Sequence, residues 1–189
     1  NKKEEHHHEE EHHEVFAPGD MRNMGGLRKT MPVTFWLYMI GTLALAGIFP
    51  FAGFWSKDEI LLDAAKVYPA AYWLLAIAAF FTAFYMGRQI WMVFFGEARH
   101  EAAAHAEESP RVMTVPLMVL AGLSVLGGAL NLPGVHTLTH WLEHTVELVE
   151  HEAHVAPWLE VSWGGLNPYV ALISTVAAVL AIVISWFIY

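Results

Sequence analysis

The chain has 189 residues, of which 56% are hydrophobic and 15% charged, and its formal net charge at pH 7 is −9. Soluble domains are roughly 45–50% apolar, so this composition favours a membrane protein. The chain contains no cysteine, which excludes disulfides, thiolate metal sites and iron–sulfur ligation. All ten lysines and arginines lie at or before Arg111, so no basic stripe is available to bind nucleic acid.

Residues 1–31 are predicted to form a polar loop. Residues 1–14 are rich in His and Glu and are typical of a solvated loop, whereas residues 15–31 carry three basic residues, Arg22, Arg28 and Lys29. The chain begins at Asn1 rather than Met and ends at Tyr189 inside an apolar run. We therefore interpret the sequence as a fragment of a longer membrane protein.

Residues 32–66 are predicted to form a broken transmembrane helix. This segment is too long for one straight crossing of about 30 Å and too short for two crossings with a loop. Pro50 lacks an amide donor and clashes with the preceding turn, so the helix is expected to break there, between Gly47 and Gly53. Ser56 and Glu59 have the spacing of a capping box, which predicts that a second helix begins at Ser56.

The 23 residues from Val33 to Trp55 carry no charge, and Ser56 and then Lys57 follow them. A lysine in hydrocarbon costs roughly 2.5–3.5 kcal/mol on insertion scales, so one held at depth usually has a function. Either Lys57 lies in water on an interfacial helix, or it lies in the membrane beside unwound backbone that lines a cavity. Spacing alone leaves both alternatives open. Asp58 is adjacent in sequence, but successive helical residues do not face each other, so we expect Asp58 to pair elsewhere.

Three further apolar segments, 72–96, 112–132 and 169–189, are long enough to be transmembrane helices, the last of them truncated. The basic loops 15–31 and 97–111 are expected on the cytoplasmic side, because cytoplasmic loops are enriched in Lys and Arg. The chain is thus predicted to be an all-α membrane protein. It would have about four transmembrane helices, the first discontinuous near Pro50, plus an amphipathic extramembrane helix.

That amphipathic helix is expected in the outer-side loop 133–168, where apolar and His/Glu positions alternate at helical spacing. His136, His140 and His144 lie at four-residue steps and could converge on a metal. Solvated His/Glu surfaces are more common, no HExxH motif is present, and the His cluster at 6–13 is no stronger a candidate. We predict no metal site. Arg88, inside the second apolar segment, is interpreted as structural, either reaching headgroups or pairing with an acidic residue.

Three runs of the sequence are familiar together: DMRNMGGLRK at 20–29, AGIFPFAGFWSKDEIL at 46–61 and FYMGRQIWMVFFGE at 84–97. They closely resemble the antiporter-like subunits of proton-pumping NADH:quinone oxidoreductase (respiratory complex I). This family is shared with Mrp-type cation/proton antiporters. The resemblance is strong over about residues 20–96 and weaker beyond.

The resemblance implies a role for the broken helix. In the family, this helix is one of two discontinuous helices in inverted repeats, and its lysine is the terminal protonatable site of a half-channel leading out of the membrane. Lys57 matches that lysine, Asp58 the neighbouring carboxylate and Pro50 the helix break, which favours the intramembrane alternative. Phe49 and Phe51 lie at positions that vary in the family. The glutamate–lysine pair of the first repeat, the central protonatable residues and the lateral helix lie outside these 189 residues, so a complete proton path is not expected here.

The expected function is that of a proton-translocating membrane subunit, coupled to quinone reduction elsewhere in the complex. NADH, FMN, iron–sulfur clusters and quinone would bind other subunits, with no cofactor and no redox catalysis in this fragment. Partners would be a neighbouring antiporter-like subunit and the lipid bilayer of a bacterial cytoplasmic membrane or an equivalent energy-transducing membrane. The alternatives are an Mrp-type antiporter or membrane hydrogenase subunit and, from another class, a non-transporting membrane scaffold or anchor.

Overall fold

The computed structural model describes residues 17, 19–128 and 167–189, and every regular element among them is helical. The elements are η1 (Met21–Asn23), α1 (Pro32–Ala46), α2 (Ala52–Val67), α3 (Pro69–Phe94), α4 (Glu101–Ala104), α5 (Arg111–Leu126) and α8 (Pro168–Ile188). The all-α prediction is therefore confirmed for the described residues. The amphipathic helix predicted within 133–168 and both His clusters lie outside them.

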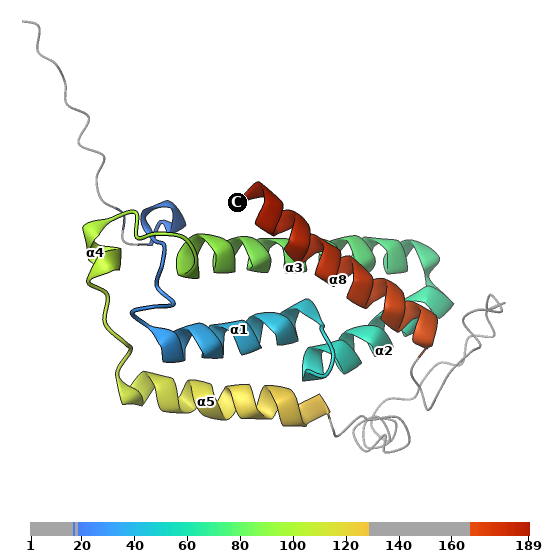
Figure 1. Cartoon of the computed structure of the whole chain (residues 1–189). Helices are drawn as coiled ribbons and strands as arrows, with labels where there is room; N and C mark the ends of the chain where they lie inside the picture. The colour runs from blue at the N-terminus through green and yellow to red at the C-terminus, as the bar shows by residue number, and fades with distance from the viewer. Residues whose placement is uncertain (1–16, 18, 129–166) are drawn as a thin grey trace, which may run out of the picture.

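Figure 1 shows that α1 and α2 follow one another in the same general direction and that the long helix α3 returns alongside both. Helix α5 lies against α1, and α8 crosses α3 obliquely while also contacting α2. The junction between α1 and α2 thus lies inside the bundle rather than at one of its ends.

Proline and glycine set the helix boundaries. Pro32, Pro69 and Pro168 begin α1, α3 and α8, where a missing amide donor costs nothing. Asn167 caps α8, because its side-chain Oδ1 accepts from the amides of Tyr169 at 2.9 Å and Val170 at 3.2 Å. These local signals fix where each apolar segment starts.

Small residues allow α3 and α8 to pack closely. Ala83 of α3 and Ala178 and Ala181 of α8 are each at most 3% exposed and belong to one buried cluster. A Cβ atom added to Gly87 would lie 3.2 Å from the side chain of Ser185, so the two helices approach closely there as well. Such contacts are how helices associate in lipid.

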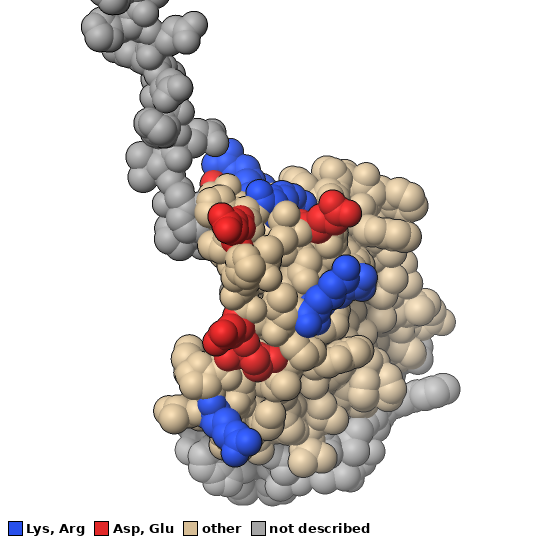
Figure 2. Space-filling model, turned by 60° about the vertical axis from the view of Figure 1, so that its left-hand side comes forward, with Lys and Arg blue, Asp and Glu red and all other residues tan. Residues whose placement is uncertain are grey.

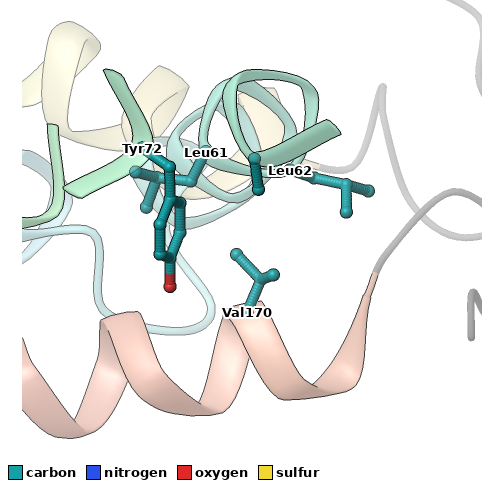
Figure 3. Close-up of a cluster of buried hydrophobic side chains, with 5 residues drawn as sticks. Leu61, Leu62, Tyr72 and Val170 are labelled. Carbon is teal, nitrogen blue, oxygen red and sulfur yellow. The ribbon is translucent and has the colours of Figure 1, made fainter. Parts of the chain in front are cut away.

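A second buried cluster joins α2 to the start of α8. It consists of Leu61, Leu62 and Ala65 of α2, Tyr72 of α3 and Val170 of α8, all at most 6% exposed (Figure 3). Because Val170 lies three residues after Asn167, this packing holds the N-terminus of α8 beside α2.

Two of the described helices, α3 with 26 residues and α8 with 21, are long and apolar enough to cross a membrane. Helices α1 and α5 are apolar but shorter, with 15 and 16 residues. Large apolar side chains are widely exposed, including Val112 at 84% and Phe187 at 80%. Such surfaces suit lipid or further protein rather than water.

The two polar loops lie at the same end of the bundle. The amide of Gly26 donates to the carbonyl of Phe95 at 3.1 Å, and the Arg99 guanidinium donates to the carbonyl of Met24 at 3.4 Å. Figure 2 brings this end forward and shows charged side chains gathered on it, with the rest of the visible surface largely uncharged.

Arg88 lies deeper in α3. Its guanidinium is 4.7 Å from the ring centroid of Tyr189 and forms a cation–π contact with it, whereas one of the two expectations was an acidic partner.

Candidate functional site

The helical path is interrupted between α1 and α2. Gly47 ends α1 in the left-handed region, with φ of 77°, where a residue with a Cβ is strained. Its amide donates to the Ala44 carbonyl at 3.1 Å, and the amide of Ile48 donates to the Leu43 carbonyl at 3.0 Å. This is the hydrogen-bond pattern of a Schellman motif. Pro50 lies in the connection that follows, so the chain is interrupted where the proline predicted a break.

Helix α2 begins directly against the end of α1. A Cβ atom at Gly53 would collide with the carbonyl of Ala44, so only a glycine permits this approach. The prediction that a helix begins at Ser56 is wrong, because α2 already begins at Ala52. Ser56 and Glu59 therefore lie within the helix, Ser56 has no helix-terminal amide to cap, and its hydroxyl instead donates to the Gly53 carbonyl at 3.5 Å. The break consists of Gly47, Pro50 and Gly53.

Lys57 reaches from α2 back to the C-terminal end of α1. Its Nζ donates to the carbonyl oxygen of Leu45 at 2.7 Å. The last four carbonyls of a helix have no partner within it, and here the carbonyls of Leu43 and Ala44 are bound by the Schellman amides. The ammonium binds a third and also complements the partial negative charge of a helix C-terminus. Lys57 itself is partly buried.

Asp58 points away from Lys57. It is 1% exposed and accepts a hydrogen bond from the backbone amide of Asn167, which is itself 0% exposed. Its Oδ1 atom has no hydrogen-bond partner among the described residues. Among these residues, Asp58 also forms no ion pair with Lys57. The expectation that Asp58 pairs elsewhere therefore agrees with its contact to Asn167, at the start of α8.

The two adjacent residues thus bind the ends of two other helices with complementary charge. The cation of Lys57 lies at the C-terminus of α1, and the anion of Asp58 lies at the N-terminus of α8. A helix end carries roughly half an elementary charge, so each pairing has the favourable sign. Removing a proton from Lys57, or adding one to Asp58, would remove the charge from one of these pairings. The arrangement can therefore couple protonation to the contacts of α2.

Glu108 occupies the opposite end of α1. Its carboxylate accepts from the amides of Val33 at 2.7 Å and Thr34 at 3.2 Å, from the Thr34 hydroxyl at 2.5 Å and from the Ser109 amide at 3.2 Å. Partial desolvation raises the pKa of Glu108, but the bonds from Thr34, Val33 and Ser109 outweigh it and hold that pKa below its usual value of 4.5.

Sequence reasoning did not identify Glu108 or Asn167. Asn167 followed by Pro168 is a recognisable helix start, although nothing in that signal reveals its contact with Asp58. Glu108 gave no signal, since its partners on α1 lie 74 and 75 residues away. Within residues 17, 19–128 and 167–189, no group of three or more His, Asp or Glu side chains is placed to hold a metal ion.

Comparison with known families matches residues 9–83 to the family described as "NADH:quinone oxidoreductase/Mrp antiporter, TM". The matched residues include the helix break, Lys57 and Asp58.

Individual relatives extend the similarity. Subunit L of the NADH-quinone oxidoreductase of Mycobacterium tuberculosis is 45% identical over 142 residues, covering 73% of this chain and 22% of the relative. Chain 5 of the NAD(P)H-quinone oxidoreductase of Synechocystis is 39% identical over 183 residues, covering 77% and 26%. Subunit L of Rhodobacter capsulatus is 47% identical over 123 residues, covering 58% and 17%. The chain therefore spans about a quarter or less of the length of these relatives.

Proposed function

We infer that this chain belongs to the NADH:quinone oxidoreductase/Mrp antiporter family of integral membrane proteins, whose model matches residues 9–83. From that premise we propose that it is part of a proton-translocating subunit of NADH:quinone oxidoreductase, of the subunit L type. The observation that carries the proposal is the interrupted helix with Lys57 bound at its break. The Lys57 ammonium is 2.7 Å from the Leu45 carbonyl at the helix end, and a change in the local electric field there can favour gain or loss of its proton.

In this proposal Lys57 is the group that accepts and releases the proton. With the proton bound, the ammonium donates to the Leu45 carbonyl and complements the end of α1. Loss of the proton removes the charge, weakens this contact and frees the lone pair of Nζ to accept the next proton. Asp58 lies one residue along α2, is directed toward α8, and in its ionised form biases the charge of Lys57.

The membrane arrangement follows from the same premise. We propose that α1 and α2 form one discontinuous crossing, because together they run alongside α3, which is long enough to span a membrane by itself (Figure 1). With α3, α5 and α8 this makes four crossings. The loops at the charged end, 15–31 and 97–111, would face the cytoplasm, as the enrichment of basic residues favours.

Redox chemistry would belong to other subunits. NADH, FMN, iron–sulfur clusters and quinone are assigned elsewhere in the complex, and the partner of this chain would be a neighbouring antiporter-like subunit. An Mrp-type antiporter subunit is the second candidate, because the matched family description names both protein classes. The relatives reported above are all oxidoreductase subunits, which favours the first candidate.

The proposal is tested by Lys57→Ala in the full-length subunit of the assembled complex, reconstituted in vesicles. We expect fewer protons pumped per NADH oxidised with assembly retained. Lys66→Ala is the matched control, since Lys66 lies on the same helix and pairs with Asp63 at 4.0 Å. Equal pumping stoichiometry in Lys57→Ala and Lys66→Ala would contradict the proposed role of Lys57.

A further inference from the structure

The N-terminal end of α1 depends on a residue from a distant loop. Pro32 has no amide hydrogen, the amide of Phe35 donates to the Met31 carbonyl at 2.9 Å, and Met31 makes no side-chain cap. The two remaining first-turn amides, of Val33 and Thr34, both donate to the carboxylate of Glu108. Every amide donor in the first turn of α1 therefore has a partner, and Glu108 binds both of the amides that the backbone leaves without an acceptor.

The other end of α1 carries the contact with Lys57. A helix of 15 residues is a rod about 22 Å long, so an axial displacement at one end appears at the other. The Lys57–Leu45 distance of 2.7 Å is short, and a hydrogen bond weakens steeply once its partners separate beyond about 3.2 Å. A group that fixes the axial position of α1 therefore also fixes the position of the Leu45 carbonyl, which is the hydrogen-bond acceptor of Lys57.

Lateral contacts hold α1 against α3 at the same level as Glu108. The Phe35 and Phe94 ring centroids lie 5.3 Å apart, and the Tyr38 hydroxyl donates to Oε1 of Gln89 at 2.6 Å. These contacts to α3 set the packing of α1 from the side. Glu108 instead binds along the helix axis, at the free amides, from the loop between α4 and α5.

We propose that Glu108 is a positioning residue for proton transfer at Lys57, acting through α1. This inference rests on the proposed function of Lys57. Glu108 binds no transported proton in this scheme; its carboxylate anchors the N-terminus of α1, and the C-terminus of α1 then presents the Leu45 carbonyl to the ammonium. The loop between α4 and α5 thereby becomes a point from which other parts of the complex can influence Lys57.

The test compares Glu108→Ala with Glu107→Ala in the full-length subunit of the assembled complex. Glu107 is the exposed neighbouring carboxylate in the same loop. In Glu108→Ala we expect proton pumping through this subunit to fall about threefold to tenfold, because small misplacements of a reacting group reduce rates on this scale or more. Glu107→Ala should pump like the wild type, and Glu108→Gln, which keeps an acceptor oxygen, should recover part of the loss.

A double variant separates positioning from general damage. If Glu108 acts through Lys57, Glu108→Ala causes no further loss of pumping in a Lys57→Ala background. Full loss in both backgrounds, or wild-type pumping in Glu108→Ala, overturns the inference. Unchanged pumping in Lys57→Ala alone contradicts the proposed function instead. Should Glu108→Ala fail to assemble, Thr34→Val removes one donor to the carboxylate and must lower pumping in the same Lys57-dependent way, or the inference is wrong.

Discussion

The two ends of α1 are both bound by charged side chains of the favourable sign, but they are bound in different ways. At the N-terminus, one carboxylate of Glu108 accepts four hydrogen bonds from three residues. At the C-terminus, the ammonium of Lys57 donates a single hydrogen bond among the described residues, to the carbonyl of Leu45. The anchor at the N-terminus comes from a loop at the charged end of the bundle, and the C-terminal contact lies at the helix break.

The number of hydrogen bonds at each end of α1 determines which of the two contacts can break more easily. Replacing Glu108 requires four donors to find new partners together, whereas Lys57 can leave the carbonyl by breaking one bond. Each ordinary hydrogen bond contributes about 0.5–1.5 kcal/mol net, and bonds to charged groups about 1.5–3 kcal/mol. The N-terminal end therefore behaves as a fixed anchor, and the C-terminal end as a contact that protonation can switch.

The largest expected effect comes from Lys57→Arg. The guanidinium keeps the positive charge and can still donate to the Leu45 carbonyl, so α1 stays bound at both ends. It cannot release a proton, because the pKa of an arginine side chain is above about 12. We expect normal assembly together with loss of the proton transfer carried by this subunit, measured as protons pumped per NADH in vesicles. If Lys57→Arg pumped normally while Lys57→Ala did not, the positive charge rather than the proton would be the function of Lys57.

A smaller effect is expected from Gly53→Ala, which changes the approach of α2 to the same end of α1. The added Cβ would meet the Ala44 carbonyl, and overpacking of this kind typically costs about 1–3 kcal/mol. We expect a lower melting temperature of the purified complex. Gly41→Ala is the matched control, since Gly41 lies within α1 with nothing within 4 Å of its added Cβ. It should be neutral or stabilising by about 0.5–1 kcal/mol, and equal destabilisation by both substitutions would contradict a tight contact at Gly53.

How far the sequence predicts this site depends on the distance over which each signal acts. Pro50 and Gly47 act on their own turns, so the break near Pro50 could be predicted from local chemistry alone. The capping box at Ser56 failed because helix α2 begins earlier, at Ala52, where Gly53 packs against α1. The capping preference of Ser56 is a local signal and could not reveal that tertiary contact.

The hydrogen-bond partners of the charged side chains could not be predicted from local signals either. The sequence marked Lys57 and Asp58 because charge is rare in an apolar segment, and it predicted that they would not pair with each other. It could not identify the Leu45 carbonyl, the Asn167 amide or Glu108 as partners, since these contacts arise from the packing of separate helices. The sequence around a polar loop residue does not indicate which helix end its side chain or amide will bind.

The smallest expected effect, at the anchored end, is a pH-dependent loss of stability in Glu108→Gln. The native pKa of Glu108 lies below its usual value of 4.5, so the ionised form stabilises the fold at any pH above that value. This contribution is lost as the pH falls through the lowered pKa, because the protonated acid accepts the same bonds more weakly. The glutamine has no such transition.

At neutral pH, Glu108→Gln should therefore be less stable than the wild type by about 0.3–1 kcal/mol, the usual scale for a charge at a helix N-terminus. The difference should stay constant down to about pH 5 and shrink on further acidification. Melting temperatures of both proteins across this range measure it, with Glu107→Gln as the control that shows no difference at neutral pH. A difference that grew as the pH fell would mean that the neutral carboxyl is the favoured cap of α1, and the contrast between an ionic anchor and a releasable ammonium would have to be abandoned.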